Sequence, residues 1–464
     1  MRSSFLLLAS AITSIQSTCK AAYVPGAAFD RFFTIWLENQ DDAKVTSNPD
    51  ILNLTTQGIL LENYYGLTHP SQPNYIASVG GDFFGLNHDA FVRIPHNVTT
   101  VVDLFEDAGI SWKGYFEGMP GPGYMGEGST GVDGKGWDYV RKHNPFVSYD
   151  SINTNGTRLQ NLLSLDDFST TVQNDPSSLP QYAHISPDML NDGHNTSLSY
   201  AANWTRSFLT PLLQNKAFMN NTLILLTYDE SETYSKPNRI YSVLLGGAVP
   251  EDKKGTVDTT IYSHYSILST LQNNWKLPNL GRYDVGANVF SLCASKTNYT
   301  NINLNMSILN NSLSYPGFLN NDPAKWAPVP VPNLQLIGAG GKGVDDYTHS
   351  EWVRAKSENT PYDGSGEFFD GGNGVTDERK PVYGSQGVNV VATATVARPY
   401  SVSATATVSG SGSGTMSASA SASATASATK GSGAERSRSV GMGMGCGKEV
   451  LGLLVAVVFA VVVL

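Results

Sequence analysis

Phe32-Phe33-Thr34-Ile35-Trp36-Leu37, which runs directly into Glu38-Asn39, is the stretch that decides the fold. A second apolar run, Leu223-Ile224-Leu225-Leu226-Thr227-Tyr228, ends in the same way on Asp229-Glu230. Apolar runs of this length predict buried strands. Ligands of an open α/β sheet bind just beyond the carboxyl ends of its strands. We therefore expect both acid pairs at one edge of a sheet, in a single site.

Strand-like and helix-like patterns alternate along the rest of the first three hundred residues. Further strands are expected over 110–115, 182–185 and 241–245, and helices over 74–79, 99–108, 200–214 and 266–275. Such alternation predicts one α/β domain over 24–315, with a mostly parallel central sheet flanked by helices.

Both ends of the chain carry patterns of a secreted, anchored protein. Residues 1–18 combine a basic start, a short apolar core and small residues, as a secretory signal peptide does. Residues 435–464 join a polar spacer to a wholly apolar tail, which predicts a GPI-attachment propeptide, with a simple tail anchor as the alternative. We expect the mature protein at the outer face of the plasma membrane or in the cell wall.

Two segments connect the expected domain to the anchor. Residues 316–400 are rich in proline and glycine, and we expect an extension that packs weakly on the core. Residues 401–434 are almost entirely serine, alanine, threonine and glycine, side chains too small to build a core. This composition predicts a disordered stalk.

N-glycosylation sequons agree with passage through the secretory pathway. They lie at Asn53, Asn97, Asn155, Asn195, Asn203, Asn220, Asn298, Asn305 and Asn310.

Composition argues against two classes of protein. Three cysteines are too few for a disulfide scaffold, and Cys293 is either a lone thiol or a partner of Cys19. The net charge is −10, from 30 basic and 40 acidic side chains. Because nucleic acids are bound by basic faces, we expect no nucleic-acid partner.

Ser71 is the candidate nucleophile. It lies in Thr68-His69-Pro70-Ser71-Gln72-Pro73-Asn74-Tyr75, where a proline in the first turn indicates the start of a helix. The N-terminus of a helix attracts anions, and a metal ion or a base there could activate the hydroxyl. Taken alone, Ser71 is more commonly a plain helix cap, so its partners decide.

The two acid pairs supply those partners. Oxygen ligands at strand ends suit a hard divalent cation, whose identity the sequence leaves open. Solvated strand-end residues are the ordinary alternative for either pair alone. Together with Ser71, the pairs favour a hydrolytic site.

A third cluster, Asp192-Gly193-His194, predicts a tight turn that brings a carboxylate and an imidazole together. Such a pair suits protonation of a leaving alkoxide or contact with a phosphoryl oxygen. His143 and His264 are further imidazoles without an assigned role, and His69 and His88 could be structural.

These motifs, in this order along residues 30–290, resemble the phosphoesterase family of secreted fungal acid phosphatases and bacterial-type phospholipases C, within the alkaline-phosphatase-like superfamily. The resemblance implies a divalent metal at Glu38, Asn39, Ser71, Asp229 and Glu230. It also implies that Ser71 becomes phosphorylated and that His143 and His194, with Asp192, bind phosphate or act as the acid. The two-zinc ligand set of the wider superfamily is not found in this sequence.

The sequence thus predicts a secreted acid phosphatase acting on small phosphomonoesters. A phospholipase C acting on a phosphodiester and a non-catalytic, GPI-anchored wall glycoprotein are the alternatives. Asn195 adjoins His194, so a glycan there would have to lie at the rim of the site or be absent.

Overall fold

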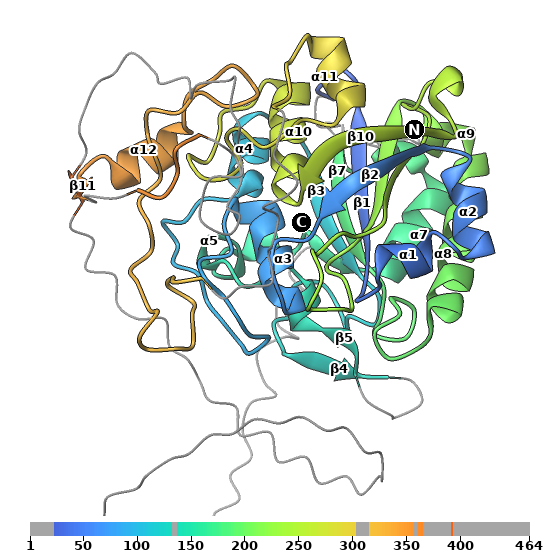
Figure 1. The fold of residues 1–464 in the computed structure, drawn as a ribbon, viewed down its shortest axis with the longest axis horizontal. Helices are drawn as coiled ribbons and strands as arrows, with labels where there is room; N and C mark the ends of the chain where they lie inside the picture. Colours follow the sequence, from blue (N-terminus) through green and yellow to red (C-terminus); the bar gives the residue numbers. More distant parts are fainter. Residues whose placement is uncertain (1–22, 132–136, 303–314, 357–359, 365–390, 393–464) are drawn as a thin grey trace, which may run out of the picture. The chain divides into compact units, whose positions relative to one another are not determined.

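The computed structural model describes residues 23–131, 137–302, 315–356, 360–364 and 391–392 (Figure 1). The expected signal peptide, stalk and anchor segment lie outside these residues, as do Asn305 and Asn310. Among the helices of the described ranges, none is both long enough and apolar enough to cross a membrane.

An eight-stranded sheet forms the centre of the fold, in the order β10-β2-β9-β8-β1-β7-β3-β6. β9 is antiparallel to both of its neighbours, and all other adjacent pairs are parallel. This confirms the expected mostly parallel sheet. Its strands are β1 (Arg31–Leu37), β2 (Ile59–Tyr65), β3 (Trp112–Phe116), β6 (Leu162–Ser164), β7 (Tyr182–Ser186), β8 (Thr222–Tyr228), β9 (Ser242–Leu245) and β10 (Thr256–Ser263).

Two short antiparallel pairs lie apart from the central sheet. They are β4 (Gly128–Thr130) with β5 (Trp137–Val140), and β11 (Ala355–Lys356) with β12 (Val391–Ala392).

Helices cover both faces of the sheet (Figure 1). α3, α4, α10 and α11 lie on one face, and α2, α7, α8 and α9 lie on the other. The helices are α1 (Asp42–Val45), α2 (Pro49–Thr55), α3 (Ser71–Gly80), α4 (Val101–Asp107), α5 (Asp150–Asn153), α6 (Gly156–Leu159), α7 (Leu165–Asn174), α8 (Leu198–Gln214), α9 (Lys216–Met219), α10 (Tyr265–Trp275), α11 (Ser291–Thr297) and α12 (Asp346–Trp352). The described ranges also contain three short 3-10 helices: η1 (Arg141–His143), η2 (Pro176–Ser178) and η3 (Glu251–Lys253).

The two central strands β1 and β8 set the position of the acid pairs. Every residue of both strands is buried, as their continuous apolar runs predict. In their parallel register Leu37 lies opposite Tyr228. Glu38 and Asp229 therefore leave the sheet at the same level, on neighbouring strands.

The differences from the sequence expectations include three unexpected strands of the central sheet, β2, β6 and β10, and one helix start. β2 and β10 were not expected, because several of their residues are exposed and neither shows a continuous apolar run. α3 begins at Ser71, three residues earlier than expected, because Pro73 fits the first turn of a helix. Ser71 is consequently the first residue of a helix whose ten residues are all buried.

The expectation of weak packing beyond residue 315 was wrong for the part that the structure describes. Phe318 and Trp352 are each 1% exposed and belong to the main hydrophobic core. The Trp352 indole Nε1 also donates to the carbonyl of Asn97 at 2.7 Å. Few apolar residues occur in this stretch, but several of them, including Val329 and Leu336, are buried, so low average hydropathy concealed their contribution.

Replacing Trp352 with alanine tests this packing. Because it would leave a cavity where a large buried side chain stood, Trp352→Ala should lower the free energy of unfolding by about 3–5 kcal/mol. Tyr347→Ala, on the same helix but 38% exposed, is the matched control and should cost less than about 1 kcal/mol. Urea denaturation measures both. Equal, small losses would mean that α12 is peripheral.

Candidate active site

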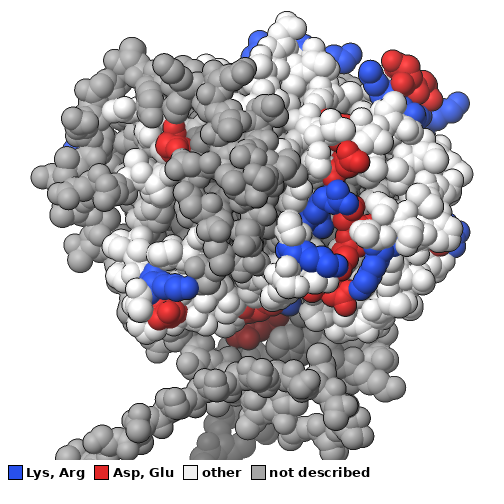
Figure 2. Space-filling model, in the orientation of Figure 1, with Lys and Arg blue, Asp and Glu red and all other residues white. Residues whose placement is uncertain are grey.

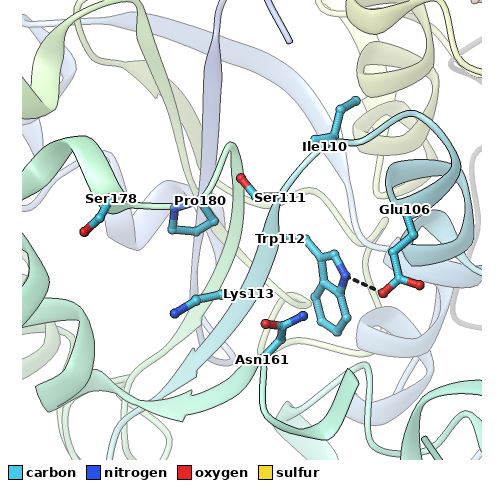
Figure 3. Close-up of a pocket in the computed structure, with 8 residues that line it drawn as sticks. All are labelled: Glu106, Ile110, Ser111, Trp112, Lys113, Asn161, Ser178 and Pro180. Carbon is cyan, nitrogen blue, oxygen red and sulfur yellow. Dashed lines mark hydrogen bonds between the residues drawn. The ribbon is translucent and has the colours of Figure 1, made fainter. Parts of the chain in front are cut away.

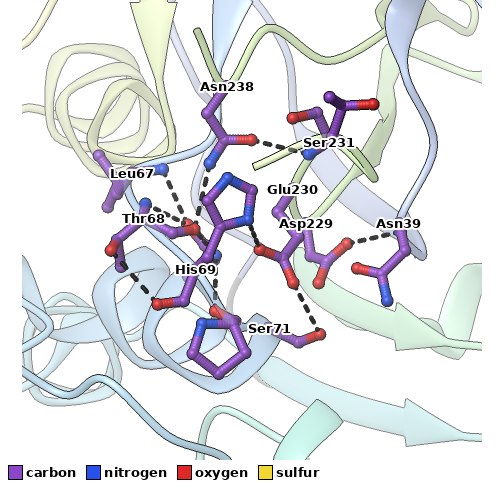
Figure 4. A network of polar contacts seen from close by, with 12 residues as sticks. Asn39, Leu67, Thr68, His69, Ser71, Asp229, Glu230, Ser231 and Asn238 are labelled. Atoms are coloured by element: carbon purple, nitrogen blue, oxygen red, sulfur yellow. Dashed lines mark hydrogen bonds and ion pairs between the residues drawn. The ribbon is translucent and has the colours of Figure 1, made fainter. Parts of the chain in front are cut away.

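Three chain segments meet beyond the carboxyl edge of the sheet (Figure 4). Glu38 follows β1, Asp229 and Glu230 follow β8, and Ser71 begins α3 after the loop that leaves β2. The backbone joins them, since Asp229 N donates to Leu37 O at 3.1 Å. All four side chains are at most 1% exposed. The predicted convergence of Ser71 with both acid pairs is therefore present.

The Ser71 hydroxyl has two carboxylate acceptors. Its Oγ lies 3.1 Å from Glu38 Oε2 and 3.3 Å from Glu230 Oε1. A hydroxyl carries one proton, so one of these carboxylates accepts it at a time. Either acid is placed to take that proton as the oxygen becomes a nucleophile.

Two buried asparagines fix the loop that presents Ser71. Asn74 accepts the backbone N–H groups of Leu67 and Thr68 through Oδ1, and its Nδ2 donates to the carbonyl of Thr68 at 2.8 Å. Asn238 donates to the same carbonyl at 3.1 Å and accepts from Ser231 N at 2.7 Å (Figure 4). The loop before Ser71 is thereby tied to the residue that follows Glu230.

Tyr75 positions Glu38 from the next turn of α3. It lies four residues after Ser71, on the same face of the helix, and its hydroxyl donates to Glu38 Oε1. The ring of Tyr75 stacks on that of His143, with centroids 5.1 Å apart. Tyr75 was not among the residues predicted for the site, although its four-residue spacing from Ser71 is visible in the sequence.

His143 lies between two acids. Its Nε2 is 3.3 Å from Glu38 Oε1, and its Nδ1 is 3.5 Å from Asp192 Oδ2. The expected tight turn is present, with Asp192 Oδ1 accepting the backbone N–H of His194 at 2.8 Å. The His194 ring is exposed and lies 6.3 Å from His143, so the structure brings both imidazoles to the site.

Asn195 lies at the rim. Its exposed side chain contacts His194, with Oδ1 2.9 Å from Nδ1.

His69 belongs to the site, although the sequence suggested that it could be structural. Its Nδ1 contacts Glu230 Oε2, and its ring stacks on Tyr234 with centroids 3.8 Å apart. Burial lowers the pKa of His69 to about 4, which favours the neutral ring, and Nδ1 is the ring atom that contacts the Glu230 carboxyl group. Its position two residues before Ser71 was the available signal; nothing in the sequence pointed to Tyr234.

Burial and mutual repulsion disfavour the ionised carboxyls. Burial and then the Asp192 carboxylate raise the pKa of Glu38 to about 8. Burial and Glu38 raise the pKa of Asp229 well above its usual range, and burial and Asp229 do the same for Glu230. A cation among these groups would reverse the effect, because it favours the charged forms.

The donors present fit a divalent cation. Asn39 Oδ1 and Asp229 Oδ2 are buried and have no hydrogen-bond partner. Buried polar atoms are rarely left unpaired. Carboxylate and amide oxygens are the ligands that hard divalent cations take. The predicted set of Glu38, Asn39, Ser71, Asp229 and Glu230 therefore offers unpaired oxygens where such an ion would need them.

A second donor set shares Glu38 with the first. Ligand atoms of Glu38, His143 and Asp192 all lie within 4.8 Å of one another, and all three residues are buried. His143 Nε2 and Asp192 Oδ2 lack hydrogen-bond partners. His143 and Asp192, which the family resemblance assigns to phosphate binding or proton transfer, thus also offer ligand atoms that a metal ion could use.

Other residues singled out from the sequence lie outside the reacting groups. His264 is fully buried, and its Nε2 contacts the carbonyl of Asp229 at 2.7 Å, which fixes the backbone beside the acid pair. Cys293 is buried, forms no disulfide with any described residue, and its Sγ contacts Asn273 Oδ1 at 3.4 Å, while Cys19 lies outside the described residues. His88 accepts from Ala90 N at 3.2 Å.

Two surface hollows lie outside this cluster. One, of about 240 Å³, is lined by Ser111, Trp112, Lys113 and the residues just before β7, at the opposite edge of the sheet (Figure 3). The other borders the site through Ser231 and is walled by Asp41 and Arg239. On the face seen in Figure 2, basic and acidic side chains are interleaved in one strip.

Comparison with known proteins gives a family match. Residues 36–278 match the Phosphoesterase family. The acid phosphatase of Aspergillus fumigatus is 44% identical over 384 residues, which cover 81% of this chain and 85% of that protein. The phosphate-repressible acid phosphatase of Penicillium chrysogenum is 46% identical over 331 residues, which cover 71% and 79%.

Likeness to solved structures is weaker. A protein of the alkaline phosphatase superfamily from Vibrio parahaemolyticus is 11% identical, with a TM-score of 0.36, over 54% of this chain and 67% of that one. Likeness at this level carries no argument about chemistry.

Tyr75→Phe tests whether the hydrogen bond to Glu38 supports metal binding. Loss of a partner that orients a ligand typically weakens metal affinity about 10–100-fold, and we expect that loss in equilibrium dialysis followed by elemental analysis. Tyr149→Phe is the matched control, because the Tyr149 hydroxyl donates to Ile76 O in the same helix, at 2.9 Å. Equal metal affinity in both variants would refute this role of Tyr75.

Proposed function

The chain belongs to the phosphoesterase family, and from this premise we propose that it is an acid phosphatase that hydrolyses phosphate monoesters through Ser71. One observation carries the proposal. The Ser71 hydroxyl lies at the start of a buried helix, within hydrogen-bond distance of the carboxylates of Glu38 and Glu230. An ordinary helix-capping serine has no need of two buried acids.

The first step forms the bond between Ser71 Oγ and phosphorus. The serine proton passes to Glu38 or Glu230, and the bond from phosphorus to the leaving oxygen breaks. His69 holds Glu230, and Tyr75 holds Glu38, so both acceptors are oriented before substrate arrives. Such preorganisation avoids rearrangement of the site during the reaction.

Glu38, Asn39, Asp229 and Glu230 would hold a divalent cation beside Ser71. When bound, such an ion supplies positive charge that favours the serine alkoxide and offsets the charge of the phosphoryl oxygens. The unpaired oxygens of Asn39 and Asp229 support this assignment.

The imidazoles supply the proton that the leaving alkoxide needs. His143 lies between Asp192 and Glu38, with Nδ1 3.5 Å from Asp192 Oδ2 and Nε2 3.3 Å from Glu38 Oε1. His194 lies nearer the surface, where a leaving alcohol departs. Because burial holds the pKa of His143 well below its usual range, we assign the proton to the more exposed His194. In the second step, water attacks the phosphoserine, inorganic phosphate leaves, and Ser71 regains its proton.

We also propose that the protein acts outside the cell, with the terminal segments as signal peptide and GPI anchor. Six of the described sequon asparagines are exposed, which supports the proposal: Asn53, Asn155, Asn195, Asn203, Asn220 and Asn298. Asn97 is half-buried.

Ser71→Ala tests the nucleophile. Without Oγ, hydrolysis of a chromogenic phosphate monoester should fall by about three orders of magnitude or more, the scale on which nucleophile deletions act. Ser78→Ala is the matched control, because Ser78 is equally buried in α3 but donates to the Tyr75 carbonyl. Full activity of Ser71→Ala would refute the assignment. A folded wild-type protein without activity would favour the non-catalytic alternative.

The choice between a monoester and a diester is a separate prediction. The same groups could open a phosphodiester, as a phospholipase C does, but the acid phosphatase relatives favour the monoester. We expect kcat/KM for a nitrophenyl phosphate to exceed that for a nitrophenyl phosphocholine by at least about tenfold, or about 1.4 kcal/mol in transition-state binding. The reverse order would support the phospholipase alternative.

A further inference from the structure

One cation beside the catalytic cluster has no role in the steps above. Lys142 lies in η1, the short turn that also carries His143 and packs against α3. Its side chain is only 17% exposed, and Nζ lies 2.9 Å from Asp89 Oδ2. Lysine side chains are rarely buried unless a partner compensates their charge, so the partners of Lys142 need to be identified.

Asp89 connects Lys142 to the turn that holds the nucleophile. Its Oδ2 pairs with Lys142, while Oδ1 accepts the backbone N–H of Gln72 at 3.0 Å. Gln72 directly follows Ser71 in α3. The Lys142 ammonium is therefore held, through one carboxylate, to the residue next to the nucleophile.

Lys142 also acts electrostatically on both halves of the site. Burial raises the pKa of Glu38 and of Glu230, and the positive charge of Lys142 partly offsets this rise. Burial lowers the pKa of His143 and of His194, and the charge of Lys142 lowers both further. Lys142 directly precedes His143 in η1, and His143 Nε2 lies 3.3 Å from Glu38 Oε1.

We propose that Lys142 is a catalytic residue that binds a non-bridging oxygen of the transferring phosphoryl group, and that Asp89 is the positioning residue that holds it there. This inference rests on the proposed function. An ammonium has three N–H donors, and the contact with Asp89 uses one of them. Charge in phosphoryl transfer is spread over the equatorial oxygens, so a fixed cation beside them stabilises the transition state.

The alternative is that the pair merely fastens the loop carrying Asp89 to η1. Ion pairs with some exposure contribute little to stability. Removing such a fastening would change the melting temperature slightly and leave phosphate binding intact. Removing a phosphoryl ligand would change phosphate binding and turnover, whatever happens to stability.

Lys142→Met keeps the aliphatic stem and removes the charge. We expect kcat/KM for a phosphate monoester to fall about 100-fold, mainly through kcat, the scale on which loss of one transition-state donor acts. Lys142→Arg should recover part of the loss, and Asp89→Asn should lose less than Lys142→Met. Arg93→Met is the matched control, because it breaks the more exposed Arg93–Asp150 pair, whose atoms lie 2.7 Å apart.

Binding of inorganic phosphate gives a readout that does not depend on turnover. In the Ser71→Ala background, adding Lys142→Met should weaken phosphate protection against thermal unfolding by at least about tenfold in concentration, whereas adding Arg93→Met should not. Unchanged phosphate affinity and kcat/KM within twofold of wild type would overturn the role of Lys142. That result, with Ser71→Ala inactive, would leave the proposed function standing. Full activity of Ser71→Ala would instead remove the function on which this inference rests.

Discussion

Burial of several carboxylates side by side is the constraint on which the rest of the site depends. Glu38, Asp229 and Glu230 are each at most 1% exposed and lie at the ends of two adjacent parallel strands. Uncompensated charges in such a place are strongly unfavourable. Protons or a cation must therefore accompany these acids, and the unpaired oxygens of Asn39 and Asp229 favour a cation.

The surrounding structure keeps these acids from separating. The Tyr75 hydroxyl donates to Glu38, His69 Nδ1 contacts Glu230, and Asn238 ties the loop of Ser71 to the residue after Glu230. Because α3 is buried along its whole length, the serine at its start has little freedom to move. Rigid support of this kind is what a reaction that depends on positioning requires.

The sequence revealed the parts of the structure whose signals are local. β1 and β8 are buried on both faces, so their apolar runs and the acids that follow them were visible without knowledge of the fold. β2 and β10 were missed because their partly exposed residues break the apolar run. Among side chains, His69 and Lys142 owe their roles to partners more than fifty residues away in the chain, Glu230 and Asp89. Only the folded sheet brings such partners together.

The central claim is that Ser71 carries the phosphoryl group between the two halves of the reaction. Trapping this intermediate is its most direct test: the enzyme is quenched in acid during turnover of a phosphate monoester, digested, and mapped by mass spectrometry. The account predicts a phosphorylated peptide with the modification on Ser71. Modification of a histidine instead, or no phosphopeptide during active turnover, would contradict it.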